Sequence, residues 1–402
     1  PFSYYAPPSE LLRADIYFEQ KNFQEAAASY KAFLDLHPRH KKESYVLYKL
    51  SESYFRQLPS TYDRDLESGE KAIISYKRLI RKFPNSIYVK EAKNKIKSCL
   101  IKRESYQVHE PIFPKNTKKV LSDCIDSTYV STKGKYIIKF QNEIKKLTKS
   151  KYILLTNTGT SALTLSLSLS NVENCEVLVP TMTFVATPNS VFYAKGIPHF
   201  IDSGKEDLNI DSIKLDKYLD KITIIKKGKC INKKTRRIIK SIIVVHSYGY
   251  PADMPSIIKV CKKYNISIIE DAAGALGSFL NKKHLGTFSK FGVLSFNGNK
   301  IITTGMGGAL MINNKNDYIK LNHLISTARL NHKWSIQHDE IGFNLRMSNL
   351  NAALGYAQIK DIKNTLKCKK KLYNSYVSQF IDDKICHFSP IENNSQPNYW
   401  LT

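Results

Sequence analysis

The chain has 402 residues, 42% of them hydrophobic, and a formal net charge of +27. This size predicts two or three domains with buried cores. The sequence contains no run of eighteen apolar residues and no leader-like first segment, so neither a membrane span nor a signal peptide is expected. Both ends are expected to be cut, because the sequence starts at Pro1 and stops at Thr402 just after an apolar run.

The positive charge is spread along the chain, with +7 in residues 1–105 and +20 in the remainder. Lysines outnumber arginines by 51 to 11, whereas recognition of phosphates and base edges favours the arginine fork. We therefore expect solvated lysine-rich faces and no nucleic-acid partner. The seven cysteines include no CxxC pair, which predicts neither a disulfide framework nor a metal site and favours a reducing compartment.

Residues 9–104 are predicted to form helices joined by short polar turns, and one segment repeats. Residues 26–31 (AAASYK) return as residues 72–77 (AIISYK), a displacement of about 46 residues. A helical hairpin of the tetratricopeptide (TPR) type spans about 34 residues, so the excess is assigned to an irregular stretch at 59–68. The first alanine of each copy permits close helix approach, and the tyrosine fills the seam. A TPR-like all-α domain is the expected fold of residues 1–105.

Four groups of residues in this half carry a family pattern: Phe18–Pro38, Ser53-Tyr54-Phe55, residues 59–65 (PSTYDRD), and Phe83-Pro84-Asn85-Ser86 with Tyr88. They closely resemble the outer-membrane assembly lipoprotein BamD. The resemblance implies a periplasmic scaffold that binds partner proteins; the alternative is an unassigned helical-repeat docking surface. The lipidated cysteine and later repeats of that family are missing, so an internal fragment is expected.

From about residue 106 the pattern changes to short apolar runs rich in β-branched residues, alternating with helical segments such as 160–170 and 254–264. The runs are Tyr152–Leu155, Glu176–Pro180, Ile197–Asp202, Ile239–His246, Ile266–Asp271, Phe291–Phe296 and Gly308–Ile312. Uniformly apolar strands are typical of a parallel sheet covered on both faces. A doubly wound α/β domain is predicted, in which ligands lie beyond the carboxyl ends of the strands.

The first candidate site residues are Gly159, Thr160 and Ser161, which follow the first of these strands and open a helix. Backbone N–H groups at such a helix start, at the positive end of the helix dipole, form a seat for an anion. Helix capping alone is the alternative reading of this turn.

Asp271 and Lys300 lie at the ends of two other strands. A carboxylate at such a position can pair with a cationic ring nitrogen and keep a pyridine ring protonated, although it could also simply cap a helix. A lysine amine can condense with the aldehyde of pyridoxal 5'-phosphate (PLP) and carry a proton. Ser295, five residues earlier, can reach the phosphate. Among 51 lysines, spacing alone does not exclude a surface role for Lys300.

A dense set of further motifs completes a second family pattern: His109-Glu110-Pro111, Cys124-Ile125-Asp126, Val130-Ser131, Gly134-Lys135-Tyr136, Pro180–Thr187, Glu270–Ala273, Ser295–Thr304 and His338–Met347. With these, residues 107–402 resemble the DegT/DnrJ/StrS sugar-nucleotide aminotransferases, and within them the LegC-like branch. The resemblance implies a fold-type I PLP-dependent enzyme. It would transfer an amino group, usually from glutamate, to C4 of a nucleotide-linked 4-keto-6-deoxy sugar.

By position, the resemblance assigns a role to each candidate. Lys300 would condense with PLP and Asp271 would partner its ring nitrogen. The phosphate would be held at the turn opened by Gly159, with Thr160, Ser161 and Ser295 as ligands.

Two further residues extend the implied site. Phe184 would stack on the ring, with ordinary core packing as the alternative. Asn344 would reach the phosphate of a neighbouring subunit, which implies a homodimer.

The sequence departs from this family at three places. Gly274 replaces a larger polar residue, and Met306 replaces a glycine. The chain also stops at Asn398–Thr402, within the small domain that would close over the substrate, so turnover is in doubt. The expected domains are a TPR-like domain at 1–105, an aminotransferase large domain at 106–362, and the start of a truncated small domain at 363–402.

Two functions remain open. The first is a cytoplasmic PLP-dependent aminotransferase for surface polysaccharide biosynthesis, with nucleotide sugar and glutamate as substrates and a possible protein partner on the helical half. The second is a BamD-like scaffold of the periplasm or outer membrane, with an inactive remnant behind it. The two compartments disagree, which suggests a fusion of two gene fragments. A catalytically silent PLP-fold regulator is less favoured because Lys300 and Asp271 are both present.

Overall fold

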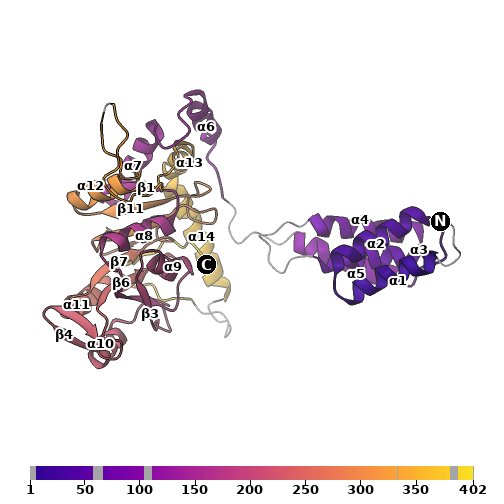
Figure 1. Cartoon of the computed structure of the whole chain (residues 1–402), viewed down its shortest axis with the longest axis horizontal. Coiled ribbons are helices and arrows are strands. Elements are labelled where there is room, and N and C mark those ends of the chain that lie inside the picture. Colours follow the sequence, from indigo (N-terminus) through magenta and orange to yellow (C-terminus); the bar gives the residue numbers. More distant parts are fainter. Residues whose placement is uncertain (1–5, 58–66, 104–110, 333, 381–387, 402) are drawn as a thin grey trace. The chain divides into compact units, whose positions relative to one another are not determined.

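The computed structural model describes residues 6–57, 67–103, 111–332, 334–380 and 388–401. The chain divides into two compact units, Pro1–Val108 and His109–Thr402 (Figure 1). Within these described ranges, no helix combines the length and apolar character that a membrane span requires. The expected junction at residues 104–107 and the motif residues 109 and 110 lie outside the described residues.

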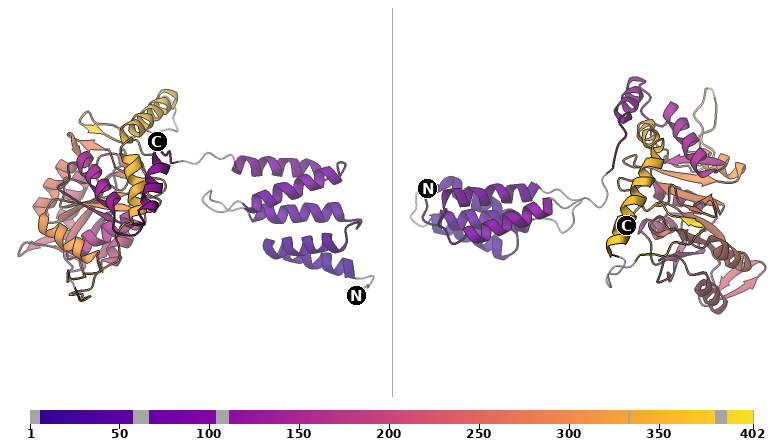
Figure 2. Two further views of the ribbon diagram at one scale, coloured as in Figure 1. Left: turned by 90° about the horizontal axis from the view of Figure 1, so that it is seen from above. Right: turned by 180° about the vertical axis from the view of Figure 1, so that it is seen from behind.

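The first unit is a stack of helices, each packed against the next in sequence (Figure 2). The helices are α1 (Ala6–Glu19), α2 (Phe23–Leu36), α3 (Glu43–Arg56), α4 (Glu67–Lys82) and α5 (Val89–Arg103). The alanine and the tyrosine of each repeat copy, Ala26, Tyr30, Ala72 and Tyr76, are all fully buried. The all-α prediction is therefore confirmed. Of the expected irregular stretch, residues 59–66 lie outside the described residues, and residues 67 and 68 are helical.

The repeat tyrosines also hold carboxylates inside this unit. Tyr30 and Tyr45 donate to Asp15 Oδ1 over 2.6 and 2.9 Å, and Tyr76 donates to Glu52 Oε2 over 2.8 Å. A buried hydroxyl costs free energy unless it is hydrogen-bonded. These pairs therefore tie α1 to α2 and α3, and α3 to α4.

The second unit is built around a seven-stranded sheet of order β1-β11-β10-β7-β6-β2-β3. The strands are β1 (Tyr152–Thr156), β2 (Glu176–Pro180), β3 (Ile197–Ile201), β6 (Ile239–Val245), β7 (Ser267–Asp271), β10 (Phe291–Ser295) and β11 (Gly308–Ile312). These are the seven predicted strands, with ends that differ by one residue at most. The mostly parallel sheet is confirmed, and β11 alone runs antiparallel to its neighbours.

Two layers of helices cover the sheet. One core contains side chains of α7 (Lys135–Thr148), α10 (Ser212–Ile222), α11 (Met254–Tyr264) and α13 (Asn349–Ile359). The other contains side chains of α8 (Gly159–Leu169), α9 (Ala186–Tyr193) and α12 (Lys315–Leu324). Along β1, Ile153 and Leu155 face the first core and Leu154 faces the second, as the two-residue period of a strand requires. Both faces of the sheet are thus covered by apolar side chains, which explains why the strands are uniformly apolar.

The remaining elements lie at the margins of this unit. They are α6 (Thr117–Asp126), α14 (Ile362–Phe380), the short helix η1 (Ser247–Gly249), the hairpin of β4 (Thr223–Lys226) and β5 (Lys229–Asn232), and a small sheet of β12 (Ser395–Gln396), β8 (Phe279–Leu280) and β9 (Lys283–His284). The small sheet joins residues more than a hundred positions apart. It therefore places the segment around residues 395–401 against the main body.

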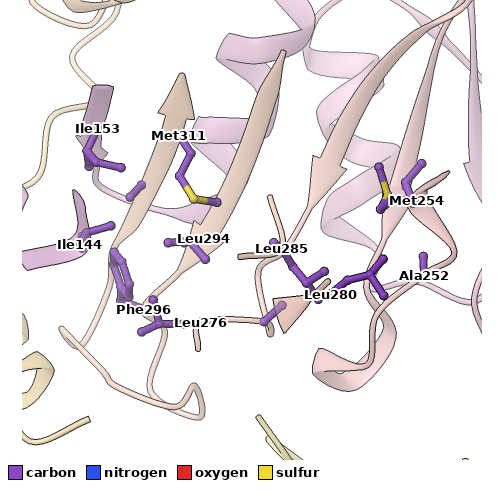
Figure 3. Close-up of a cluster of buried hydrophobic side chains, with 14 of the residues drawn as sticks. Ile144, Ile153, Ala252, Met254, Leu276, Leu280, Leu285, Leu294, Phe296 and Met311 are labelled. Carbon is purple, nitrogen blue, oxygen red and sulfur yellow. The ribbon is translucent and has the colours of Figure 1, made fainter. Parts of the chain in front are cut away.

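Aromatic rings fill the first core where α7 meets the sheet. Figure 3 shows part of this core, with Phe296 beside Leu294 and Ile144 near the end of β10. The fully buried ring of Phe140 lies 5.1 Å from that of Phe296, centroid to centroid. The packing is close enough that a Cβ on Gly355 would lie 2.5 Å from the Phe140 ring. There is thus little room for rearrangement around this ring.

We predict that Phe140→Ala lowers the free energy of unfolding of the second unit by about 3–5 kcal/mol, because it leaves a cavity that tight neighbours cannot fill. Ile138→Ala on the same helix is the control, since Ile138 is 62% exposed and its loss should change stability by about 0.5 kcal/mol or less. Urea unfolding followed by tryptophan fluorescence reports this unit alone, because both tryptophans, Trp334 and Trp400, belong to it. Equal effects of the two changes would contradict the packing described.

Candidate active site

A cavity of about 540 Å³ opens at the carboxyl ends of β6, β7 and β10. We call it the strand-end cavity; its lining includes Gly159, Thr160, Phe184, Thr187, His246, Asp271, Ser295, Lys300 and Trp400. The three strands are parallel neighbours in the sheet, so the groups that follow them reach the same edge. Six of the eight candidate residues from the sequence line this cavity; Ser161 and Asn344 do not.

Asp271 is the last residue of β7 and is buried. Thr187 Oγ1 donates to Asp271 Oδ2 over 2.9 Å, and the backbone N–H of Ala273 donates to Asp271 Oδ1 over 3.1 Å. The Thr187 hydroxyl is itself bonded to that of Thr183 over 2.7 Å. These contacts fix the orientation of a carboxylate that borders the cavity.

Lys300 follows β10, and its amine points into the strand-end cavity. Nζ lies 3.5 Å from the centroid of the Trp400 ring. Burial lowers the pKa of Lys300 from 10.5 to about 8, while the charge of Asp271 acts in the opposite direction. Removal from water disfavours the ammonium form. The amine is therefore far closer to neutrality at physiological pH than that of a surface lysine.

The N-terminus of α8 forms one wall of the cavity. Thr158 is the N-cap, and its Oγ1 accepts from the backbone N–H of Ser161 over 3.0 Å. The first N–H groups of a helix have no acceptor within the helix, so those of Gly159 and Thr160 are suited to an anion. A Cβ on Gly159 would lie 3.0 Å from Ser295 Cβ, which shows how closely the end of β10 approaches this turn.

The remaining candidates lie farther from this wall. The Ser161 hydroxyl donates to Asn157 Oδ1 over 2.7 Å and so belongs to the helix cap. Phe184 is 78% exposed, which excludes the core-packing alternative. Asn344 is exposed and bridges to Ser326; its expected reach toward a neighbouring subunit concerns a second chain.

A buried hydrogen-bonded pair, Glu270 and His246, lies directly behind Asp271. His246 Nδ1 accepts from the backbone N–H of Ala252 over 3.2 Å, so its proton resides on Nε2 and is donated to Glu270 Oε2 over 3.1 Å. Glu270 also accepts from the backbone N–H groups of Gly286 and Ser289, each over 2.7 Å. Burial raises the pKa of Glu270, but the hydrogen bonds from His246 and Ser289 outweigh it and hold this pKa below 4.5. The network locks β6 and β7 together where the cavity begins.

Several residues of this site were not among the candidates from the sequence. His246 ends a predicted strand next to that of Asp271, so the strand-end rule could have identified it. Thr187 was visible within a motif, but nothing in the sequence indicated that its hydroxyl reaches Asp271. Trp400 lies one hundred positions from Lys300 and gave no local signal.

We predict that Glu270→Ala lowers the free energy of unfolding of the second unit by about 3–5 kcal/mol, because it leaves His246 and two N–H donors without their buried partner. The control is Glu173→Ala, whose carboxylate is 61% exposed in a surface ion pair. Wild-type stability should also fall as the pH drops below 4.5, since a carboxyl with a lowered pKa stabilises the fold only while ionised. Urea unfolding at several pH values tests both points; a variant with the wild-type pH profile and stability would contradict them.

Known proteins resemble both units. Residues 112–402 match the DegT/DnrJ/EryC1/StrS aminotransferase family, and residues 1–106 match an outer membrane lipoprotein family. The chain is 36% identical over 270 residues to a GDP-perosamine synthase of Escherichia coli O157:H7, covering 67% of this chain and 70% of that protein. It is 33% identical over 267 residues to a UDP-4-amino-4,6-dideoxy-N-acetyl-beta-L-altrosamine transaminase of Campylobacter jejuni, covering 65% and 66%.

A solved structure supports the same relationship. PseC of Helicobacter pylori, an aminotransferase involved in the biosynthesis of pseudoaminic acid, matches with a TM-score of 0.62 and 28% identity, over 69% of this chain and 71% of that one. Both family resemblances predicted from motifs are thus confirmed, and so is the fold class.

Proposed function

Since residues 112–402 make this chain a member of the DegT/DnrJ/EryC1/StrS aminotransferase family, we propose that it transfers an amino group from glutamate to C4 of a nucleotide-linked 4-keto-6-deoxy sugar. One observation carries the proposal: the amine of Lys300 and the carboxylate of Asp271 border one cavity together with a helix N-terminus. The names of the relatives include GDP- and UDP-linked amino sugars, which favours a nucleotide-sugar acceptor.

The residues of the strand-end cavity fit pyridoxal phosphate. Its aldehyde needs an amine of moderate basicity, and Lys300 has a pKa of about 8. Its ring nitrogen needs an acid partner, which Asp271 supplies. Its phosphate needs N–H and hydroxyl donors, which Gly159, Thr160 and Ser295 offer around the start of α8. Each chemical group of the cofactor thus has a complementary group in one cavity of suitable size.

When bound, the cofactor supplies an electron sink for the pair released as a substrate C–H bond loses its proton. The chain supplies the remainder. Asp271, held by Thr187, would be the partner of the ring nitrogen. Lys300 Nζ takes up the proton and returns it, which a group with a pKa near the working pH does efficiently. Phe184 offers an exposed flat face to the cavity.

We further propose that this enzyme unit forms a homodimer in the cytoplasm and that Asn344 reaches the partner's phosphate. Exposed apolar side chains in the chain segment that precedes Asn344 support this proposal: Trp334, Ile336 and Ile341 are each at least 71% exposed. Within the unit, we propose a large domain at 106–362 and the beginning of a small domain at 363–402.

The match of residues 1–106 to an outer membrane lipoprotein family favours a second role for the first unit. We propose that its helical repeats dock a protein partner. A pull-down with residues 1–108 alone would test whether this unit binds a partner in the absence of the enzyme. The same fragment with Tyr76→Phe, which removes the hydroxyl bonded to Glu52, is the control with a weakened fold.

We predict that the purified protein, mixed with pyridoxal phosphate, shows a visible absorbance band and that Lys300→Ala abolishes this band. Reduction with borohydride should make the bond between the cofactor and the lysine permanent, so that the peptide containing Lys300 gains mass. Lys282→Ala, which removes an exposed lysine, should leave the band unchanged. Persistence of the band in Lys300→Ala would show that another lysine holds the cofactor.

The pH dependence of this reaction follows from the pKa of Lys300. Only the neutral amine is nucleophilic, so trapping at Lys300 should rise with pH and level off above about 8. Trapping at lysines of ordinary basicity should keep rising well above that pH, because only their uncharged fraction reacts. Mass spectrometry of the Lys300 and Lys282 peptides across this range measures both. Parallel curves would contradict a buried amine.

The acceptor is identified by loading the enzyme with glutamate and adding keto-sugar nucleotides. A 4-keto-6-deoxy sugar on a nucleotide should yield the 4-amino product, and Asp271→Asn should lower the rate by several orders of magnitude. Transfer to a simple keto acid with no reaction on any keto-sugar nucleotide would contradict the proposal.

A further inference from the structure

The segment that follows β12 contributes Trp400 and Leu401 to the lining of the strand-end cavity and is held in place by one buried amide. Asn398 is 1% exposed. Its Nδ2 donates to the carbonyl oxygens of Gly274 and Leu276 over 2.7 and 3.0 Å, and its own backbone N–H donates to Ser278 Oγ over 3.0 Å. Its Oδ1 accepts the backbone N–H of Trp400 over 3.0 Å. The amide therefore fixes the position from which Trp400 projects.

Trp400 is held at both ends. Its indole Nε1 donates to the carbonyl oxygen of Asn299 over 2.6 Å, and its carbonyl oxygen accepts from Lys369 Nζ over 3.2 Å. Between these contacts, the indole face lies 3.5 Å from Lys300 Nζ. An ammonium over an indole is attracted by the ring quadrupole, and Trp is the aromatic residue that binds cations best.

Gly274 provides the space in which the indole lies. A Cβ at this position would be 2.4 Å from Trp400 Cε3 and 2.6 Å from Cζ3. Real Cβ contacts are longer than this, so no other residue at 274 is compatible with the indole where it stands. Gly249 is matched to the segment in the same way, since a Cβ there would be 2.1 Å from Asn398 Oδ1. Two glycines thus accommodate this one segment.

We propose that Trp400 is a positioning residue for Lys300: its indole face seats the lysine amine in the cavity, and Gly274 and Asn398 keep the indole in that place. Asn299, which accepts from the indole, directly precedes Lys300 in the chain. The indole therefore contacts both the backbone of this turn, at the Asn299 carbonyl oxygen, and the side chain of Lys300. The contact between Trp400 and Lys300 does not depend on the proposed function. Its importance for amino transfer rests on that function.

Fluorescence tests the seat without any cofactor. In a Trp334→Phe background Trp400 is the only tryptophan, and it is partly shielded from water. Adding Asn398→Ala or Gly274→Ala should shift its emission to longer wavelength and increase quenching by acrylamide, while circular dichroism stays unchanged. Lys282→Ala, which changes an exposed residue elsewhere, should leave the emission and the quenching unchanged. Unchanged emission in both site variants would overturn the proposed seat.

A double-mutant cycle on the dissociation constant for pyridoxal phosphate tests the positioning role. Gly274→Ala should weaken binding about tenfold, since overpacking displaces the ring, and Trp400→Ala should weaken it by a similar factor through loss of the seat. Once Trp400 is alanine, Gly274→Ala should cost little more, because the clash has gone. Trp400→Phe should recover most of the affinity.

Additive effects, or a phenylalanine at 400 no better than alanine, would overturn the positioning role. A wild-type protein that binds no pyridoxal phosphate would instead defeat the proposed function, and the fluorescence measurement would still decide whether the seat exists.

Discussion

The enzyme unit depends on one constraint: three parallel strands that are neighbours in the sheet must end at the same edge. These strands are β6, β7 and β10. The fully buried Glu270–His246 pair joins β7 to β6 at this edge, since Glu270 is the second-last residue of β7 and His246 directly follows β6. A carboxylate with a lowered pKa in that place is stable only because four donors surround it. The positions of Asp271 and Lys300 follow from this anchored edge.

The sequence was informative wherever a local rule determines structure. Uniformly apolar runs predicted all seven strands of the main sheet, and the strand-end rule led to Asp271, Lys300 and the turn at Gly159. The rule failed where a contact depends on chain segments far apart. Trp400 could not be predicted, because its place results from the Asn398 amide and from the missing side chain of Gly274.

The lowered pKa of Lys300 results from where the fold places this residue. Burial disfavours the charged amine, while Asp271 favours it. The pKa falls near 8, where both protonation states are available. Gly274 and Met306, which distinguish the sequence from its family pattern, both line the same cavity.

A crystal structure of the protein grown with pyridoxal phosphate would test the central claim most directly. The account predicts continuous electron density from Lys300 Nζ to the cofactor, the Asp271 carboxylate beside the ring nitrogen, and the phosphate at the start of α8. Density for the cofactor on any other lysine, or a ring turned away from Asp271, would contradict it.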